Sequence, residues 1–193
     1  MKIAIIGGGI SGLATYLQLQ KNVVKDAKLK ESFSITIFEP YDLRHLGDLK
    51  PADIPSHGGG YGLAPNGMAS LRRLDPDIHE QILRNGFPSA KTWMKSARGW
   101  TLGSMPFFDV TGEYPECCVM VLRETVLQAL YKRVPLSNIV QQRVIEVKDG
   151  ENSASIKLDN GEEHTFDLII GADGIWSKAR RALIGDSHPP EYK

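Results

Sequence analysis

Short apolar runs alternate along the chain with segments of helical periodicity. Residues 2–6 (KIAII) are apolar and β-branched with little alternation, which predicts a strand buried on both faces. Apolar residues then follow a helical stripe over residues 10–19, and residues 34–39 (SITIFE) predict a second strand that ends at Pro40. This order predicts a β-α-β unit at the start of the chain.

The middle of the chain predicts a loop followed by short strands and helices. Residues 41–60 contain several Pro and Gly and little periodicity, so they predict a loop. The pattern that follows predicts a strand, a turn at Pro65–Asn66 and a helix within 61–74, one or two strands with bends at Gly99 and Gly103 within 91–108, a strand over 119–122 and a helix over 123–134.

The last third predicts a β meander and a second buried strand. Residues 139–148 and 155–158 alternate as strands, and Asn160–Gly161 predicts a hairpin turn of type I′. Residues 167–170 (DLII) predict a fully buried strand that runs into a glycine-containing segment. Trp93 and Trp100 suit an aromatic pocket, but packing within a strand pair explains them more simply.

Composition narrows the class of protein. The 193 residues are 41% hydrophobic and 24% charged, which is typical of a soluble globular protein with room for one domain, or for one and part of a second. Lys plus Arg and Asp plus Glu number 23 each, so the net charge is zero. This balance argues against a nucleic-acid partner or an anionic membrane.

Cysteine use and hydropathy predict a cytoplasmic location. Cys117 and Cys118 are neighbours, which rarely bridge, and two cysteines give neither a disulfide framework nor a four-ligand zinc site. No histidines stand at metal-ligand spacing, so no metal is expected. No apolar run reaches the ~18–20 residues of a transmembrane span, and the first residues do not form a signal peptide.

Three glycines after the first strand form a G-x-G-x-x-G motif, with Gly7, Gly9 and Gly12 at its key positions. The first allows a tight turn, the second lets backbone N–H groups approach a pyrophosphate, and the third lets the helix pack close to the strand. Ile10 and Ser11 would offer N–H groups at the helix N-terminus, where negative charge is favoured. The alternative is a glycine-rich turn without a ligand.

Glu39 closes the second strand and is the expected partner of a ribose. Its carboxylate would accept hydrogen bonds from the 2′-hydroxyl and would repel a 2′-phosphate, which argues against NADP in this pocket. Its distance from Gly12 exceeds the usual ~20 residues, consistent with a lengthened helix-to-strand connection. FAD and NAD both remain as ligands, and a solvated strand end is the alternative.

A second glycine motif follows the strand at residues 167–170. Gly171 and Gly174 allow a sharp turn, Asp173 presents a carboxylate there, and Ser177 can cap the next helix, which carries Arg180. The segment predicts a second place for a polar ligand at the carboxyl end of a strand in the same sheet. A plain NAD dehydrogenase leaves this motif unexplained, although Asp173 as a simple turn residue is the alternative.

The chain resembles the single-component FAD-dependent monooxygenases of the para-hydroxybenzoate hydroxylase type over nearly its whole length. The resemblance rests on Glu39 and on the segments GGGISG (7–12), HGGGYGLAPNGMASL (57–71), VLRETVLQAL (121–130) and GADGIWSKAR (171–180).

The resemblance implies a role for each matching residue. Gly7, Gly9 and Gly12 would take the FAD pyrophosphate together with Ile10 and Ser11, and Glu39 the adenosine ribose. Gly58 would approach the flavin, although Gly59 or Gly60 aligns equally well. Arg123 would reach the phosphate or ribityl region, and a helix-start surface residue is its alternative. Asp173 would serve the FAD site and NAD(P)H engagement, with Arg180 in support. No catalytic acid or base is assigned.

The fold class that follows is α/β, a Rossmann-like FAD-binding βαβ domain with part of a β-rich substrate domain, incomplete at the C-terminus. The expected division is residues 1–75 and 119–185 for the FAD-binding domain, 76–118 for a partial substrate-domain insertion and 186–193 for the start of a truncated substrate-domain strand. The family's third motif, a GD followed by an Ala-His pair, does not occur after the DG motif in this sequence. The expectation is therefore an N-terminal portion or a natural truncation.

The implied reaction is hydroxylation of a small, aromatic substrate by O₂ through a flavin hydroperoxide, with NAD(P)H as transient reductant. Without the third motif, the 193 residues alone are expected to bind FAD weakly and not to hydroxylate. The alternatives are a non-catalytic FAD-binding remnant and another FAD-dependent oxidoreductase of the same fold, such as a flavin halogenase or an isoprenoid reductase.

Overall fold

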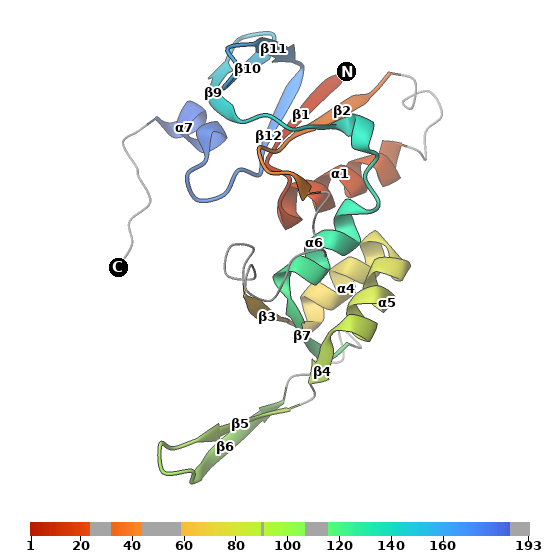
Figure 1. Cartoon of the computed structure of the whole chain (residues 1–193), viewed down its shortest axis with the longest axis vertical. Coiled ribbons are helices and arrows are strands. Elements are labelled where there is room, and N and C mark those ends of the chain that lie inside the picture. The colour runs from red at the N-terminus through yellow and green to blue at the C-terminus, as the bar shows by residue number, and fades with distance from the viewer. Residues whose placement is uncertain (24–31, 44–58, 90, 107–115, 186–193) are drawn as a thin grey trace. The chain divides into compact units, whose positions relative to one another are not determined.

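The computed structural model describes residues 1–23, 32–43, 59–89, 91–106 and 116–185 (Figure 1). The chain forms two compact units, and one of the two boundaries between them falls within a helix, α6 (Arg123–Tyr131). The first unit comprises Met1–Arg44 and Leu130–Lys193, and the second comprises His45–Ala129. The predicted division at residues 75 and 118 concerns cofactor and substrate roles, so it stays a prediction.

A four-stranded parallel sheet forms the centre of the first unit. Its order is β12-β1-β2-β8, with bounds Leu168–Gly171, Lys2–Ile6, Ser34–Phe38 and Ile139–Val140. Ile6, at the end of β1, pairs with Phe38 of β2 and with Gly171 of β12. The carboxyl ends of these three strands therefore lie side by side at one edge of the sheet (Figure 1).

Both faces of β1 are covered, as its uninterrupted apolar run predicts. Ala4 and Ile6 belong to a buried cluster with the β meander on one face. Ile3 and Ile5 point to the other face because side chains alternate along a strand, and both are at most 2% exposed. Helix α1 (Ile10–Val23) contacts β1 and β2. The predicted β-α-β unit is confirmed.

The meander consists of β9 (Val144–Asp149), β10 (Ala154–Leu158) and β11 (Glu163–Phe166), in the order β11-β10-β9. Its inward side chains Val144, Ile156, Leu158 and Phe166 bury the apolar face that Ala4, Ile6 and Phe38 present. The rings of Phe38 and Phe166 meet edge to face, with centroids 5.8 Å apart. This cluster fastens the meander to the parallel sheet.

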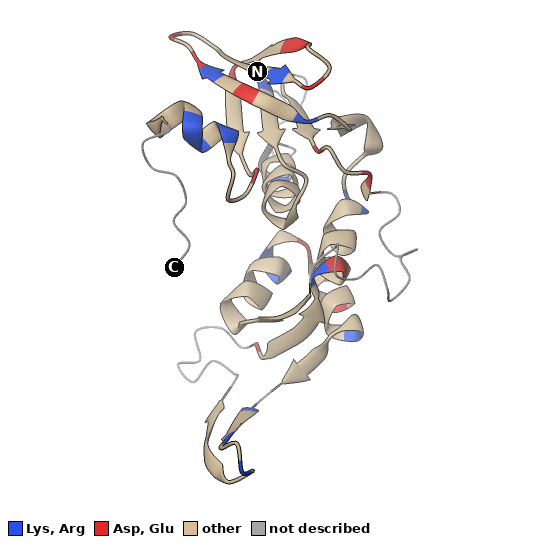
Figure 2. Ribbon diagram, turned by 60° about the vertical axis from the view of Figure 1, so that its left-hand side comes forward, with Lys and Arg blue, Asp and Glu red and all other residues tan. Residues whose placement is uncertain are grey.

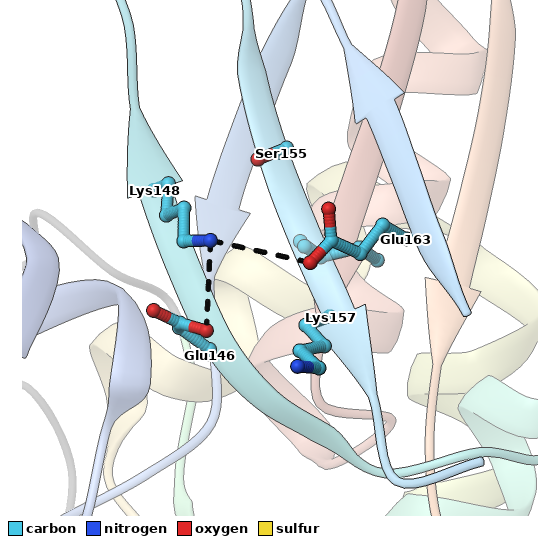
Figure 3. Close-up of a pocket in the computed structure, with 6 residues that line it drawn as sticks. Glu146, Lys148, Ser155, Lys157 and Glu163 are labelled. Atoms are coloured by element: carbon cyan, nitrogen blue, oxygen red, sulfur yellow. Dashed lines mark ion pairs between the residues drawn. The ribbon is translucent and has the colours of Figure 1, made fainter. Parts of the chain in front are cut away.

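The outer face of the meander is charged and exposed. Figure 3 shows a shallow depression there, where Lys148 Nζ lies 3.8 Å from Glu146 Oε2 and 4.0 Å from Glu163 Oε1. Exposed pairs of this kind contribute only about 0–1 kcal/mol. The depression is thus a solvated surface with mixed charge, and it offers no enclosed site for a cofactor.

The second unit has its own antiparallel sheet in the order β3-β7-β4, with bounds Gly60–Leu63, Cys118–Leu122 and Phe87–Ser89. Helices α4 (Pro65–Leu74) and α5 (Pro76–Asn85) contact it, and α6 (Arg123–Tyr131) follows β7 directly. A hairpin of β5 (Lys91–Lys95) and β6 (Thr101–Pro106) completes the unit.

Buried polar groups of this unit pair with one another. His79 is 6% exposed, and its Nε2 lies 3.0 Å from Glu116 Oε2. Arg72 Nε lies 3.1 Å from the other oxygen of the same carboxylate. The Glu116 carboxylate therefore ties α4 and α5 to the segment that leads into β7.

Two expected turns differ in the structure. Pro65 and Asn66 begin α4 instead of forming a turn, because proline at the first helical position has a favourable φ, and the backbone N–H that it lacks would have no partner within the helix. The Asn160–Gly161 hairpin exists, but only Gly161 has a positive φ, +89°. A type I′ turn needs a positive φ at both central residues, so the predicted type is wrong.

Other expectations fail where strands change partner or lie at the surface. Residues 139–148 form two strands in different sheets, β8 and β9, because the chain turns where Gln142 N–H donates to Val140 O. Gly103 lies within β6, next to a shift in the register of the β5–β6 pair. Trp93 and Trp100 are 59% and 74% exposed, so neither forms a core among the described residues.

The buried cluster under the meander predicts that substitutions of two isoleucines on adjacent strands differ in their effect on stability. Ile156 is 1% exposed and Ile145 is 40% exposed. We expect Ile156→Ala to lower the free energy of unfolding by about 2–5 kcal/mol, since it removes buried methyl groups and leaves a cavity. Ile145→Ala, the matched control, should change it by less than about 0.5 kcal/mol. Urea unfolding followed by far-UV circular dichroism measures both, and equal losses would contradict the arrangement.

Candidate functional site

The candidate site lies at the edge of the first unit's sheet where β1, β2 and β12 end. The segment after β1 carries the first glycine motif, Glu39 follows β2, and Asp173 follows β12. Because β1 lies between the other two strands, its turn is flanked by both carboxylate-bearing segments. This is the edge where ligands bind in open α/β sheets.

The first glycine motif makes the tight turn that it predicts. Gly7 has φ +103°, and its N–H donates to Phe38 O at 2.8 Å. A Cβ on Gly12 would lie 1.9 Å from Gly7 O. The start of α1 therefore lies so close to the end of β1 that only glycine fits at position 12. Gly9 O accepts from Leu13 N–H at 3.0 Å as α1 begins.

The N-terminus of α1 suits an anion. Ile10 begins the helix and Ser11 is exposed, while Gly12 is buried against the strand. The first N–H groups of a helix have no carbonyl partner within it, and the helix dipole adds positive potential there. The first turn of α1 contains no acidic residue that would offset this potential.

Glu39 is buried at the centre of the edge. It is 8% exposed, so it is not a solvated strand end. Gly8 N–H donates to its Oε2 at 2.7 Å, and Tyr41 N–H donates to its Oε1 at 3.0 Å. A carboxylate has about four acceptor positions, so each oxygen keeps one for a further donor such as a ribose hydroxyl.

The loop after β12 reaches the first glycine motif. Ala172 N–H donates to Ile6 O at 2.8 Å, and a Cβ on Gly7 would lie 2.4 Å from Ala172 O. The two glycine motifs, far apart in the sequence, thus pack backbone against backbone. Asp173 is the next residue, and its backbone N would lie 3.1 Å from the same Cβ.

Asp173 holds the start of α7 (Lys178–Ile184). Its Oδ2 accepts from Lys178 N–H at 2.5 Å and from Ala179 N–H at 3.4 Å. Its Oδ1 is buried and has no hydrogen-bond partner among the described residues. A buried acceptor without a donor is costly, so this oxygen suits a ligand hydroxyl or a water molecule.

Two further side chains stabilise the same loop. Ser177 caps α7 as predicted, with its Oγ accepting from Arg180 N–H at 2.9 Å. The Arg180 guanidinium Nη2 donates to Ile175 O at 2.7 Å, which closes the loop between β12 and α7. Figure 2 shows the Lys and Arg positions of α7 in blue, close to this loop.

The remaining predicted residues belong to the second unit or lie outside the described residues. Gly58 falls in the range 44–58, which the structure does not describe. Arg123 begins α6, and its N–H donates to Gly59 O at 3.1 Å. Burial raises the pKa of the Tyr61 phenol, and the nearby Arg123 guanidinium partly offsets this rise. A role for Arg123 in cofactor binding stays a prediction.

Sequence reasoning missed two contributors to this edge. Gly8 donates the shorter of the two backbone hydrogen bonds to Glu39, and a Cβ there would lie 2.8 Å from Glu39 Cβ. The sequence does show Gly8 as the middle one of three consecutive glycines in GGGISG, but the G-x-G-x-x-G motif allows any residue at that position. Tyr41 was also missed, because it contacts Glu39 through its backbone N–H, and the type of side chain gives no indication of such a contact.

In the described ranges, no group of three or more His, Cys, Asp and Glu is arranged to hold a metal ion. The same part of the chain contains no helix with the length and apolarity to cross a membrane. Cys117 and Cys118 are both free thiols, and burial raises the pKa of Cys118, with a smaller contribution from Cys117.

Sequence comparison agrees with this geometry. The chain is 30% identical to the chloroplastic zeaxanthin epoxidase of Spinacia oleracea over 193 residues, and 27% identical to the FAD-dependent monooxygenase pigN of Monascus ruber over 203 residues. The chain is thus similar in sequence to FAD-dependent monooxygenases. The matches cover 97% and 100% of this chain but only 26% and 41% of those two proteins. No family model matches the chain.

Solved structures confirm the fold class. Klebsiella pneumoniae HpxO complexed with FAD and uric acid aligns with a TM-score of 0.71 at 18% identity, over 94% of this chain and 41% of that one. CtdE in complex with FAD and a substrate aligns with a TM-score of 0.74 at 18% identity, over 99% and 42%. At these identities the likeness shows the fold, which is the predicted α/β fold of FAD-binding proteins.

The close contact of α1 with β1 predicts that substitution of Gly12 lowers the stability of the fold. Gly12→Ala should lower the free energy of unfolding by about 1–3 kcal/mol, because its Cβ would overlap Gly7 O. The control is Gly67→Ala in α4, where a Cβ would lie 3.6 Å from Leu63 Cδ2 in ordinary contact. This control should leave stability unchanged or raise it, by up to about 1 kcal/mol. Urea unfolding distinguishes the two, and a tolerated Gly12→Ala would contradict the described contact.

Proposed function

We propose that the carboxyl edge of the first unit binds FAD and that the chain supplies this cofactor site to a monooxygenase. One observation carries the proposal: the turn after β1 lies between the buried Glu39 carboxylate, which holds Gly8 N–H, and the Ala172–Asp173 backbone. A dinucleotide needs an anion-binding helix start and a ribose acceptor next to each other, and this edge has both.

Each residue has a distinct part in this proposal. Gly7, Gly9 and Gly12 clear space for the pyrophosphate, and the N–H groups of Ile10 and Ser11 face its charge. Glu39 uses its two remaining acceptor positions for the ribose hydroxyls. Asp173 offers its buried Oδ1 to a hydroxyl of the cofactor. Gly58 and Arg123 are proposed for the flavin end of the cofactor.

The proposed reaction is the oxygenation of a small organic substrate. When bound, FAD takes two electrons from NAD(P)H and lets O₂ deliver one oxygen atom to the substrate while the other leaves as water. The protein holds the cofactor, orients it and excludes water. Hydroxylation of an aromatic ring is the form proposed here. One of the relatives is named as an epoxidase, a type of enzyme that adds oxygen to a double bond instead.

The alternative is an FAD-binding protein without monooxygenase activity. The chain spans about a quarter to two fifths of the length of the relatives described above, 26% and 41%. The activity, the substrate and NAD(P)H as the reductant are therefore proposed for the whole protein. A cytoplasmic location also stays a prediction, since the zeaxanthin epoxidases are named as chloroplastic.

The test of the cofactor site compares two glutamates. The purified chain should bind FAD, seen as quenching of flavin fluorescence during titration. Glu39→Gln should weaken binding by at least about tenfold, because it removes the charged acceptor of the ribose hydroxyls. Glu163→Gln, at a side chain 56% exposed on the meander, is the matched control and should bind like the wild type.

Stability measurements accompany this titration. The amide side chain introduced by Glu39→Gln keeps one oxygen for Gly8 N–H, so the variant should remain folded by circular dichroism. Equal FAD affinity in the wild type and in Glu39→Gln would contradict the assignment of Glu39. A wild-type chain that binds no FAD would contradict the proposed function as a whole.

A further inference from the structure

An exposed aromatic ring lies next to the buried carboxylate of the proposed cofactor site. Tyr41 is 68% exposed, although it follows the buried Glu39 by only two residues. Its backbone N–H donates to Glu39 Oε1 at 3.0 Å. The residue that anchors the carboxylate through its backbone thus carries a large aromatic side chain whose surface remains mostly open to solvent.

The Tyr41 ring has a cationic partner from another strand segment. The Arg143 guanidinium carbon lies 5.8 Å from the ring centroid, within the range of a cation–π contact. Arg143 immediately precedes β9, and its carbonyl accepts from Asp159 N–H at 2.9 Å. The ring and the guanidinium form a pair, which we call the Tyr41–Arg143 platform.

Backbone hydrogen bonds fix this platform relative to Glu39. Glu39 N–H donates to Val140 O at 3.0 Å, where β2 pairs with β8. Gln142 N–H donates to the same carbonyl at 2.9 Å, so the chain turns there and leads directly to Arg143. The two members of the platform therefore come from segments that follow adjacent parallel strands: Tyr41 follows β2, and Arg143 follows β8, which lies on the side of β2 away from β1.

The chemistry of the platform suits a flat aromatic ligand. One side of the Tyr41 ring meets a cation, while most of the residue is exposed and able to stack. Stacking of a base on an aromatic side chain is favourable for every base because each has a π face. In an adenine dinucleotide the base is bonded directly to the ribose, so a ribose at Glu39 brings the adenine within reach of the neighbouring residues.

We infer that Tyr41, supported by Arg143, is the stacking surface for the adenine ring of the bound dinucleotide. This inference rests on the proposed function and adds a specificity role to it. Tyr41 would favour ligands that carry a purine beside the ribose over flavins that lack one. FMN, which has the flavin and one phosphate but no adenosine, does not reach the platform.

The test uses Tyr41→Ala and Tyr41→Phe in the full chain, with FAD, ADP and FMN as the three probes. Both variants keep the backbone N–H that donates to Glu39, so the carboxylate keeps its anchor. Tyr41→Ala should weaken FAD and ADP binding by about tenfold, the loss expected when one stacked base loses its aromatic partner. Tyr41→Phe keeps the ring, so its affinities should stay within about twofold of the wild type.

A second variant tests the cationic half of the platform. Arg143→Gln keeps a polar side chain of similar reach but removes the charge over the ring. It should weaken ADP binding by about two- to fivefold, as expected for an exposed cation–π contact. FMN affinity should be the same in all of these variants and in the wild type, because FMN has no group for the platform.

The outcomes separate this inference from the proposed function. If the wild type binds FAD but Tyr41→Ala binds FAD and ADP with unchanged affinity, the stacking role is overturned and the FAD site stands. Equal weakening of FMN by Tyr41→Ala would also overturn it, because the loss would then be general. A wild type that binds neither FAD nor ADP would overturn both, and thermal unfolding of each variant identifies any loss that comes from misfolding.

Discussion

The hydrogen bond from Gly8 N–H to the buried Glu39 carboxylate is the contact around which the candidate site is organised. A buried carboxylate is costly unless hydrogen bonds satisfy it. Here, at 8% exposure, Glu39 receives one N–H at 2.7 Å from the turn after β1 and one at 3.0 Å from Tyr41. The carboxylate thus joins two strand ends and still keeps acceptor positions for a ligand.

The rest of the first unit holds this contact in place. The parallel pairing of β1 with β2 and β12 sets three strand ends at one level, and α1 and the meander cover the two faces of the sheet. Gly12 lets α1 start close to Gly7, and the loop after β12 also packs on Gly7. The glycines act by their lack of a side chain, because backbone atoms fill the space that a Cβ would need.

Much of this was predictable from sequence because it depends on local patterns. The apolar run of 2–6, the G-x-G-x-x-G motif and the strand before Gly171 each indicate their own structure, and the meander showed alternation. The prediction that the strand before Gly171 is fully buried is wrong, because β12 is the outermost strand of its sheet and Leu168 is 41% exposed. Three features depend on contacts between distant segments and were missed or wrong: the split of residues 139–148 between two sheets, the role of Gly8, and the position of Tyr41 beside Arg143. Periodicity gives no indication of which sheet a short strand joins, and a hydrogen bond from a backbone N–H is independent of the side chain.

The most direct test of the central claim is the response of backbone amides to FAD, recorded by two-dimensional ¹H–¹⁵N NMR. If the two glycine motifs and the Glu39 segment form one site, the amide signals of residues 7–12, of Glu39 and Tyr41, and of residues 171–174 should all change, with the same dependence on FAD concentration. A response of residues 7–12 without any change at 171–174 would contradict a shared site, as would different affinities for the two segments.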